Sequence, residues 1–95
     1  MSLVTPLVVP QVNVNDDTVL LVAWSAADGS SVTAASVVCD VETTKAASEV
    51  TAPADGVLVH GATVGSHVKV GATIGAIGPT REAAAAYLAS VANQS

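Results

Sequence analysis

Short apolar runs separated by turn-forming clusters occupy the chain up to Pro79. Runs rich in Val and Thr, about five to eight residues long as is usual for β-strands, alternate with clusters of Asn, Asp, Gly, Ser and Pro. This pattern predicts six strands, two shorter strand pieces and no helix before residue 80. The strands are expected near residues 5–12, 18–24, 37–43, 47–51, 57–63 and 73–77, and the shorter pieces near 31–34 and 67–70.

The chain also contains an internal repeat with an offset of 36 residues, which is the spacing between Gly29 and Gly65. At this offset residues 29–32 align with residues 65–68, and Val38 aligns with Ile74. Each half is too small to bury its apolar face alone. We therefore expect the two halves to pack as a sandwich or flattened barrel with approximate two-fold symmetry.

The composition changes after Pro79. Thr80 is a suitable N-cap for a short helix that begins at Arg81, and the alanines at 83–86 are strong helix formers. A narrow apolar stripe follows, made of Tyr87, Leu88 and Val91. Because a lone helix of about 12 residues is marginal in water, residues 80–95 are expected to be either a linker to a further domain, which we favour, or a helix packed on its own barrel or on a second copy.

Composition narrows the class of protein. Of the 95 residues 51% are hydrophobic, which suits one small domain, and they include 18 Val and 18 Ala but only 6 Leu and no Phe. Such a core is built from small, β-branched side chains that favour thin β-structure, so we expect no roomy catalytic cleft. Three basic residues against eight acidic ones give a net charge of −5, which would repel nucleic acid and anionic membrane surfaces.

Location and redox state are also constrained. The longest apolar runs, 19–24 and 83–89, are much shorter than the roughly 20 residues that cross a bilayer. No basic N-terminal region precedes an apolar stretch, so we expect no export signal and a cytoplasmic location. The single cysteine, Cys39, excludes an internal disulfide and a cysteine-rich zinc site. It is expected to be a small buried or half-buried apolar residue, with a redox role as the alternative.

Residues of the kinds that perform catalysis are present, but their spacing matches no catalytic motif. His60 and His67 lack metal-ligand spacing and are expected on a strand and at the surface. The glycines of the second half are expected at turns and bulges rather than in a phosphate-binding loop. Asp40, Glu42 and Glu49 surround one turn and are expected to form a charged rim rather than a buried acid and base pair.

Within that rim lies one of the two lysines of the chain, Lys45, at the predicted tip of a hairpin. A hairpin tip gives a lysine the greatest exposure and the fewest neighbours, as an enzyme requires if it is to acylate the amine with a long carrier group. At the repeat offset the counterpart of residue 45 is residue 81. We therefore expect Lys45 to lie at the opposite end of the domain from residue 80 and from the entering strand near Pro6.

The motifs around this lysine, taken together, resemble the lipoyl domain of 2-oxo acid dehydrogenase complexes and the related H-protein of glycine cleavage. They are Glu-Thr-Thr-Lys-Ala at 42–46, Glu49, Ala-Pro-Ala-Asp-Gly at 52–56, Asp-Gly-Ser-Ser-Val at 28–32, the spaced glycines at 65–71, and Trp24 in the second strand. The resemblance covers about residues 8–78. The sequence departs from the family pattern at three places. Thr44 replaces the usual Asp before the lysine, Ala-Ser at 35–36 replaces the usual Gly-Asp, and Val-Pro-Gln-Val-Asn at 9–13 replaces the usual Met-Pro-x-Leu-Gly.

The resemblance implies an all-β barrel-sandwich hybrid of two four-stranded antiparallel sheets related by pseudo-two-fold symmetry, with a carrier domain over residues 5–79. It also implies that Lys45 is amide-linked to lipoate, and that the modifying enzyme recognises the hairpin through Glu42, Thr43, Thr44 and Ala46. Biotin carriers share the fold but have Met on both sides of the lysine. Thr44 and Ala46 therefore disfavour biotin.

By the same resemblance, the domain would have no active site of its own and would serve a dihydrolipoyllysine acyltransferase component. Its arm would shuttle acyl groups and reducing equivalents in a 2-oxo acid dehydrogenase-type complex. The implied partners are a lipoate ligase, or an octanoyltransferase with lipoyl synthase, a thiamine diphosphate-dependent 2-oxo acid decarboxylase and dihydrolipoamide dehydrogenase. A biotin carrier and an unmodified structural module of the same fold are the alternatives.

Overall fold

A computed structural model describes residues 3–12, 15 and 17–92, which form eight strands followed by one helix. The strands are β1 (Thr5–Val8), β2 (Thr18–Trp24), β3 (Ser31–Val32), β4 (Val37–Glu42), β5 (Ala47–Thr51), β6 (Gly56–His60), β7 (His67–Lys69) and β8 (Thr73–Gly78), and the helix is α1 (Arg81–Ala92). Each predicted strand is present. As predicted, the described residues before residue 80 contain no helix.

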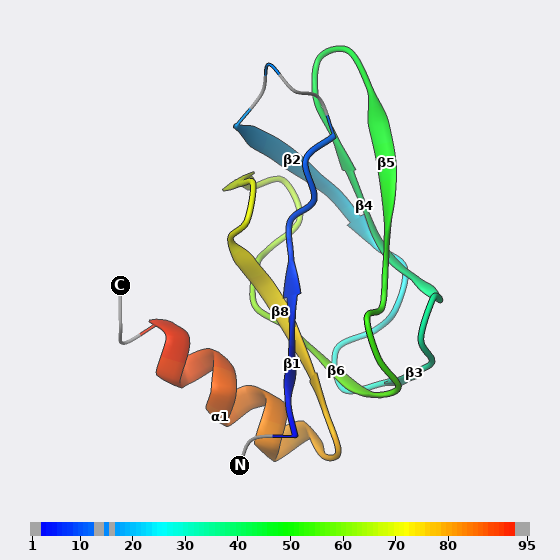
Figure 1. Cartoon of the computed structure of the whole chain (residues 1–95), viewed down its shortest axis with the longest axis vertical. Coiled ribbons are helices and arrows are strands. Elements are labelled where there is room, and N and C mark those ends of the chain that lie inside the picture. The colour runs from blue at the N-terminus through cyan, green and yellow to red at the C-terminus, as the bar shows by residue number, and fades with distance from the viewer. Residues whose placement is uncertain (1–2, 13–14, 16, 93–95) are drawn as a thin grey trace.

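The strands form two four-stranded antiparallel sheets (Figure 1). One sheet has the order β1-β8-β6-β3, and the other has the order β5-β4-β2-β7. If β1 is exchanged with β5, β2 with β6, β3 with β7 and β4 with β8, the strand order of one sheet becomes that of the other. This equivalence confirms the predicted barrel-sandwich hybrid with pseudo-two-fold symmetry.

The turns confirm the predicted repeat. β4 and β8 begin and end at equivalent positions of the two halves. Positive φ angles occur at Gly29 and Gly65, and again at Ala35 and Gly71, which are two pairs of positions related by the same offset. Ala35, with a φ of 72°, is the one non-glycine residue with a positive φ among the described residues. The two halves therefore share their backbone turns even where their side chains differ.

One aromatic stack joins the two halves. The rings of Trp24 and His60, which are equivalent positions of the repeat, lie with centroids 3.9 Å apart and planes 9° apart. Trp24 Nε1 donates to the carbonyl of Ala62 at 3.0 Å, and His60 Nε2 bonds to the carbonyl of Ala26 at 2.8 Å. Since a carbonyl only accepts, His60 carries a hydrogen on Nε2. His60 is thus a half-buried strand residue with a defined role in packing.

Several strands end earlier than predicted, and the largest differences are at the ends of β1 and β6. β1 has four residues because Val9 donates its N–H to the carbonyl of Ala72 outside the strand ladder, and Pro10 has no N–H to donate. β6 ends at His60, and after one further bond from the Gly61 N–H to the Ile74 carbonyl the chain enters a turn in which the Ser66 N–H donates to the carbonyl of Thr63. Both predicted strands had continued into turn residues.

The core between the sheets consists of aliphatic side chains, as the composition predicts, and the described residues include no buried polar or charged one. Its largest fully buried side chains include Leu7, Leu21, Leu58, Ile74 and Ile77. Cys39 is fully buried, which confirms its expected role as a small apolar residue. Burial, assisted by the charge of Asp40, raises the pKa of the Cys39 thiol to about 11. The thiol is therefore protonated and unreactive near neutral pH.

Helix α1 packs on β6 and β8 of the first sheet. Thr80 Oγ1 accepts the N–H of Ala83 at 3.1 Å, which confirms the predicted N-cap. Ala84 is fully buried and packs with Val59 and Ala76 of the sheet. Small side chains on both surfaces allow this close approach, so residues 81–92 form a docked helix rather than the linker that we favoured from composition. Within the described ranges, no helix has the length and apolar character that crossing a membrane requires.

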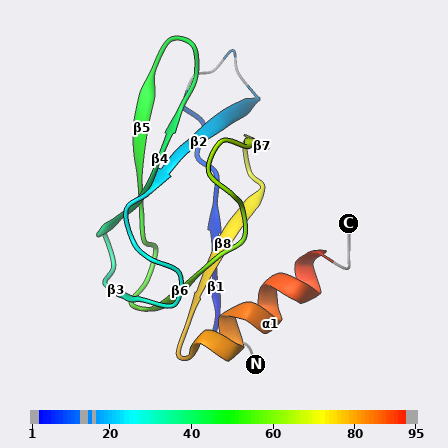
Figure 2. The same ribbon diagram turned by 180° about the vertical axis from the view of Figure 1, so that it is seen from behind.

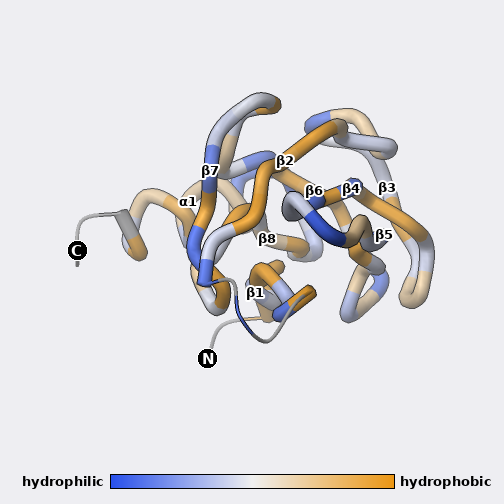
Figure 3. The backbone as a smooth tube through the Cα atoms, turned by 90° about the horizontal axis from the view of Figure 1, so that it is seen from above, coloured by the Kyte–Doolittle hydropathy of each residue, from blue (hydrophilic) through white to orange (hydrophobic). Residues whose placement is uncertain are grey.

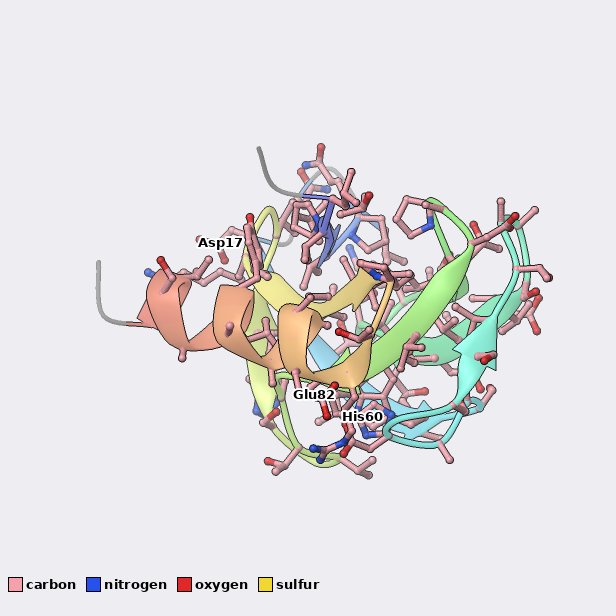
Figure 4. The ribbon with its side chains drawn as sticks, turned by 90° about the horizontal axis from the view of Figure 1, so that it is seen from below. Asp17, His60 and Glu82 are labelled. Carbon is pink, nitrogen blue, oxygen red and sulfur yellow. The ribbon has the colours of Figure 1, made fainter. Side chains whose placement is uncertain are left out.

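Asp28 ties the start of α1 to the barrel. Its Oδ1 accepts the backbone N–H of His60 at 2.8 Å, and its Oδ2 accepts from the Arg81 guanidinium at 3.0 Å. These two bonds hold the pKa of the Asp28 carboxyl below its usual 3.8. In Figure 4, His60 at the end of β6 and Glu82 in the first turn of α1 are labelled close to each other.

The two ends of the long axis, which measures 37 Å, carry different parts of the chain. The loop between β4 and β5 lies at one end, whereas the start of β1 and the junction of β8 with α1 lie at the other (Figures 1 and 2). This placement confirms the expectation that Lys45 is remote from residue 80 and from Pro6.

Candidate functional site

The β4–β5 hairpin carries the residues that the sequence singles out. The two strands pair antiparallel up to Glu42, which lies opposite Ala47. Val41 and Val50 are buried in the core and anchor the hairpin to the barrel. Residues 43–46 extend beyond the last strand pair as a short loop. The loop thus stands on a base held by hydrogen bonding and by apolar packing.

Thr43 and Ala46 close this loop on each other. The Thr43 N–H donates to the Ala46 carbonyl at 2.7 Å, and the Thr43 hydroxyl donates to the same oxygen at 3.3 Å. In return, Thr43 Oγ1 accepts the N–H of Ala46 at 3.1 Å and that of Lys45 at 3.3 Å. Only Thr44 and Lys45 lie beyond this closure, and they form the tip.

The tip is exposed, and the strands that lead to it carry acidic residues. Residues 44–47 are all exposed, and among the described residues the Lys45 ammonium has no ion-pair partner. Asp40 lies opposite Glu49 in the strand register, and Glu42 ends β4, so the two strands below the tip carry three carboxylates, none of which is buried. These strands thus bear the acidic residues expected around the turn. Figure 3 looks down on this end and shows blue, hydrophilic stretches along the hairpin, while β2 is largely orange.

The two histidines lie at different places. His60 stacks on Trp24 where the two halves meet. His67 is exposed in β7, as expected, and lines a surface pocket beside the loop together with Glu42, Thr43 and Thr44. Lys69 lies in β7 opposite Thr18. The described residues contain no group of three or more His, Cys, Asp or Glu side chains suited to a metal ion. What the hairpin offers is a single accessible primary amine. Such an exposed amine is suited to modification by another enzyme.

The chain belongs to the biotin/lipoyl attachment family. The sequence model of the family described as "Biotin-requiring enzyme" matches residues 5–77, which is the barrel from the start of β1 almost to the end of β8. Among the curated proteins, none matches this chain. The match and the fold together define a biotin/lipoyl carrier domain, in agreement with the family resemblance. Members of the family carry biotin or lipoate covalently on a lysine.

Two features of the molecule escaped the sequence analysis. The first is the closure of the loop by the Thr43 hydroxyl, for which the only signal is a Thr placed just before a turn. The second is the stack of Trp24 on His60. The repeat offset aligns positions 24 and 60, but that alignment alone does not indicate a contact. In both cases the signal was present, but its meaning depends on contacts that only the folded chain defines.

Proposed function

We propose that the domain is a lipoyl carrier and that Lys45 is its attachment residue. The observation that carries this proposal is the position of Lys45 on a closed hairpin, exposed and without an ion-pair partner among the described residues. Members of its family carry their cofactor on a lysine. Amide formation would replace the cationic ammonium by a neutral group. The residues beside the lysine, Thr44 and Ala46, favour lipoate over biotin by the resemblance given above.

The role of this chain is to hold and present the arm. The lipoyl group, when attached, supplies the redox and acyl-transfer chemistry through its dithiolane. Because Lys45 lies at the far end of the long axis from α1, an arm there is free of the rest of the domain. Tethering would raise the local concentration of the arm at each partner. The carboxylates of Asp40, Glu42 and Glu49 would steer the hairpin toward basic entrances.

The proposed partners follow from this role. A lipoate ligase, or an octanoyltransferase with lipoyl synthase, would modify Lys45 by recognising Glu42, Thr43, Thr44 and Ala46. A thiamine diphosphate-dependent 2-oxo acid decarboxylase would load the arm, coenzyme A would accept the acyl group, and dihydrolipoamide dehydrogenase would reoxidise the dithiol. The chain would then be the carrier part of a dihydrolipoyllysine acyltransferase component.

Biotin carriage is the second candidate, because the matched family is described by its biotin-requiring members. Intact mass after incubation with lipoate ligase, lipoate and ATP, and separately with biotin ligase, biotin and ATP, distinguishes the two. We expect the lipoyl increment on Lys45, located by peptide mapping, and little biotinyl increment. A biotinyl increment alone would reassign the cofactor. The absence of both increments would leave an unmodified structural module.

A further inference from the structure

We propose that Thr43 is a positioning residue for the modification of Lys45. It would hold the tip backbone in the shape that the modifying enzyme accepts, rather than touch that enzyme through its hydroxyl. This inference rests on the proposed function and adds to it a role for one residue, argued from the hydrogen bonds of the hairpin.

The Thr43 hydroxyl is already fully used inside the loop. A threonine hydroxyl can donate once and accept twice. Here it donates to the Ala46 carbonyl and accepts from the N–H groups of Lys45 and Ala46. No donor or acceptor position is left for a partner molecule. The residue is also only partly exposed, whereas Thr44, Lys45 and Ala46 are all exposed.

The hydroxyl adds to the backbone bond that closes the loop, which runs from the Thr43 N–H to the Ala46 carbonyl. Two-residue hairpin loops favour turns with positive φ at the central residues, commonly supplied by Gly or Asn. Neither Thr44 nor Lys45 has a positive φ, and the N–H of Ala46 donates to the Thr43 side chain. A side-chain acceptor therefore replaces the special turn. This leaves the lysine position free of any glycine requirement.

The closure fixes the residue that bears the amine. With the N–H groups of Lys45 and Ala46 held by one oxygen, the tip backbone is ordered before an enzyme arrives, and the ordering cost is removed from binding. Loss of the oxygen would release both N–H groups to water. Because the loop is exposed, the barrel would be little affected, and the cost would fall on the modification step.

The test compares Thr43→Val, Thr43→Ser and Thr43→Asn in the full chain with lipoate ligase, lipoate and ATP, scored by intact mass over time. Val keeps the shape but removes the oxygen, so we expect kcat/KM to fall about tenfold, mainly through KM. Ser restores the hydroxyl. Asn restores an acceptor for the N–H groups two and three residues ahead without a hydroxyl, so both variants should stay within about threefold of the wild type.

Thr33→Val is the matched control, since its hydroxyl also bonds within an exposed turn, to Ser36 at 2.6 Å, in a different loop. We expect it to be modified at the wild-type rate, and the Tm of the Thr43 variants to fall by no more than about 4 °C. Acylation of Lys45 by a small amine-reactive reagent should be unchanged in Thr43→Val, because the amine remains exposed.

Three outcomes would overturn the inference. One is a wild-type rate for Thr43→Val, and another is a Tm loss that accounts for the lower rate. The third is rescue by Ser but not by Asn, which would mean that the enzyme contacts the hydroxyl itself. Failure of the proposed function has a different signature, because then the wild-type chain gains no lipoyl group at all. If biotin ligase modifies the wild type instead, the same variants test Thr43 with that enzyme.

Discussion

The two ends of the barrel use the same local device and reach opposite results. At one end Thr43 Oγ1 accepts the N–H of Ala46, and at the other Thr80 Oγ1 accepts the N–H of Ala83, in both cases three residues ahead. After Thr43 the chain turns back as β5, whereas after Thr80 it continues as α1. A threonine that caps the backbone thus does not by itself decide between a hairpin and a helix.

The residues that follow make the decision. Beyond Ala46 the sequence Ala-Ser-Glu-Val-Thr at 47–51 places Val50 on the core side and pairs with β4, so tertiary packing favours a strand. Beyond Thr80 four consecutive alanines at 83–86 favour a helix, and Ala84 buries against the sheet. One end therefore presents a bare lysine, while at the other end the equivalent basic residue, Arg81, is bonded to Asp28.

The largest effect should come from removing the lysine that distinguishes the two ends. Lys45→Arg should abolish attachment of lipoate, as measured by intact mass, because arginine offers no primary amine to acylate. On an exposed tip the free energy of unfolding should change by no more than about 0.5 kcal/mol. Lys69→Arg is the control and should be modified as fully as the wild type. A lipoyl increment on the Lys45→Arg chain would remove Lys45 as the attachment residue.

The end of the barrel opposite Lys45 can be perturbed separately by changing the contact of α1 with β6 and β8. Ala84→Leu should lower the free energy of unfolding by about 1–3 kcal/mol, since a larger side chain overpacks a fully buried site while helix propensity stays high. Ala86→Leu makes the same change at an exposed position of α1 and should be nearly neutral. Urea unfolding measures both. Because the ends are independent, lipoylation rates should not change, and a slower rate for Ala84→Leu would refute that independence.

The two halves also differ at one strained turn. Ala35→Gly should raise the free energy of unfolding, and Gly71→Ala should lower it, each by about 1 kcal/mol, because a side chain at positive φ is strained. A Cβ at Gly71 would meet nothing within 4 Å, so the change in stability of Gly71→Ala reports the backbone conformation alone. Denaturant midpoints of the two variants and the wild type measure this. Shifts of the same sign in both variants would contradict the equivalence of the turns.

The smallest effect concerns the bond between α1 and the barrel. Since the folded-state pKa of Asp28 is lowered, its carboxylate contributes stability above its ordinary pKa of 3.8, and this contribution disappears as pH falls below that value. Asp28→Asn should therefore be less stable than the wild type at pH 7, and the difference should close in acid. Thermal unfolding at several pH values tests this. A difference that persists unchanged well below pH 3.8 would mean that charge is not the cause.

The sequence predicted the strands, the repeat and the exposed position of Lys45, because alternation of Val with turn residues reports local structure directly. It was less informative wherever one segment contacts another. The docking of Ala84 on Val59 and Ala76 could not be predicted from an Ala-rich tail, since alanines suit a linker and a close helix contact equally. The closure of the loop by Thr43 was hidden for a similar reason, because an exposed Thr before a turn most often bonds only to water.

The stack between Trp24 and His60 gives the chain an intrinsic optical signal. The chain contains one tryptophan, and its indole lies against an imidazole from the other half of the repeat at 3.9 Å. Separation of the halves must part the two rings, so tryptophan emission follows the integrity of the barrel as a whole. The stack is formed by β2 and β6 rather than by the hairpin loop, so we expect a group added at Lys45 to leave this signal unchanged. Fluorescence and mass therefore report folding and modification separately in one sample.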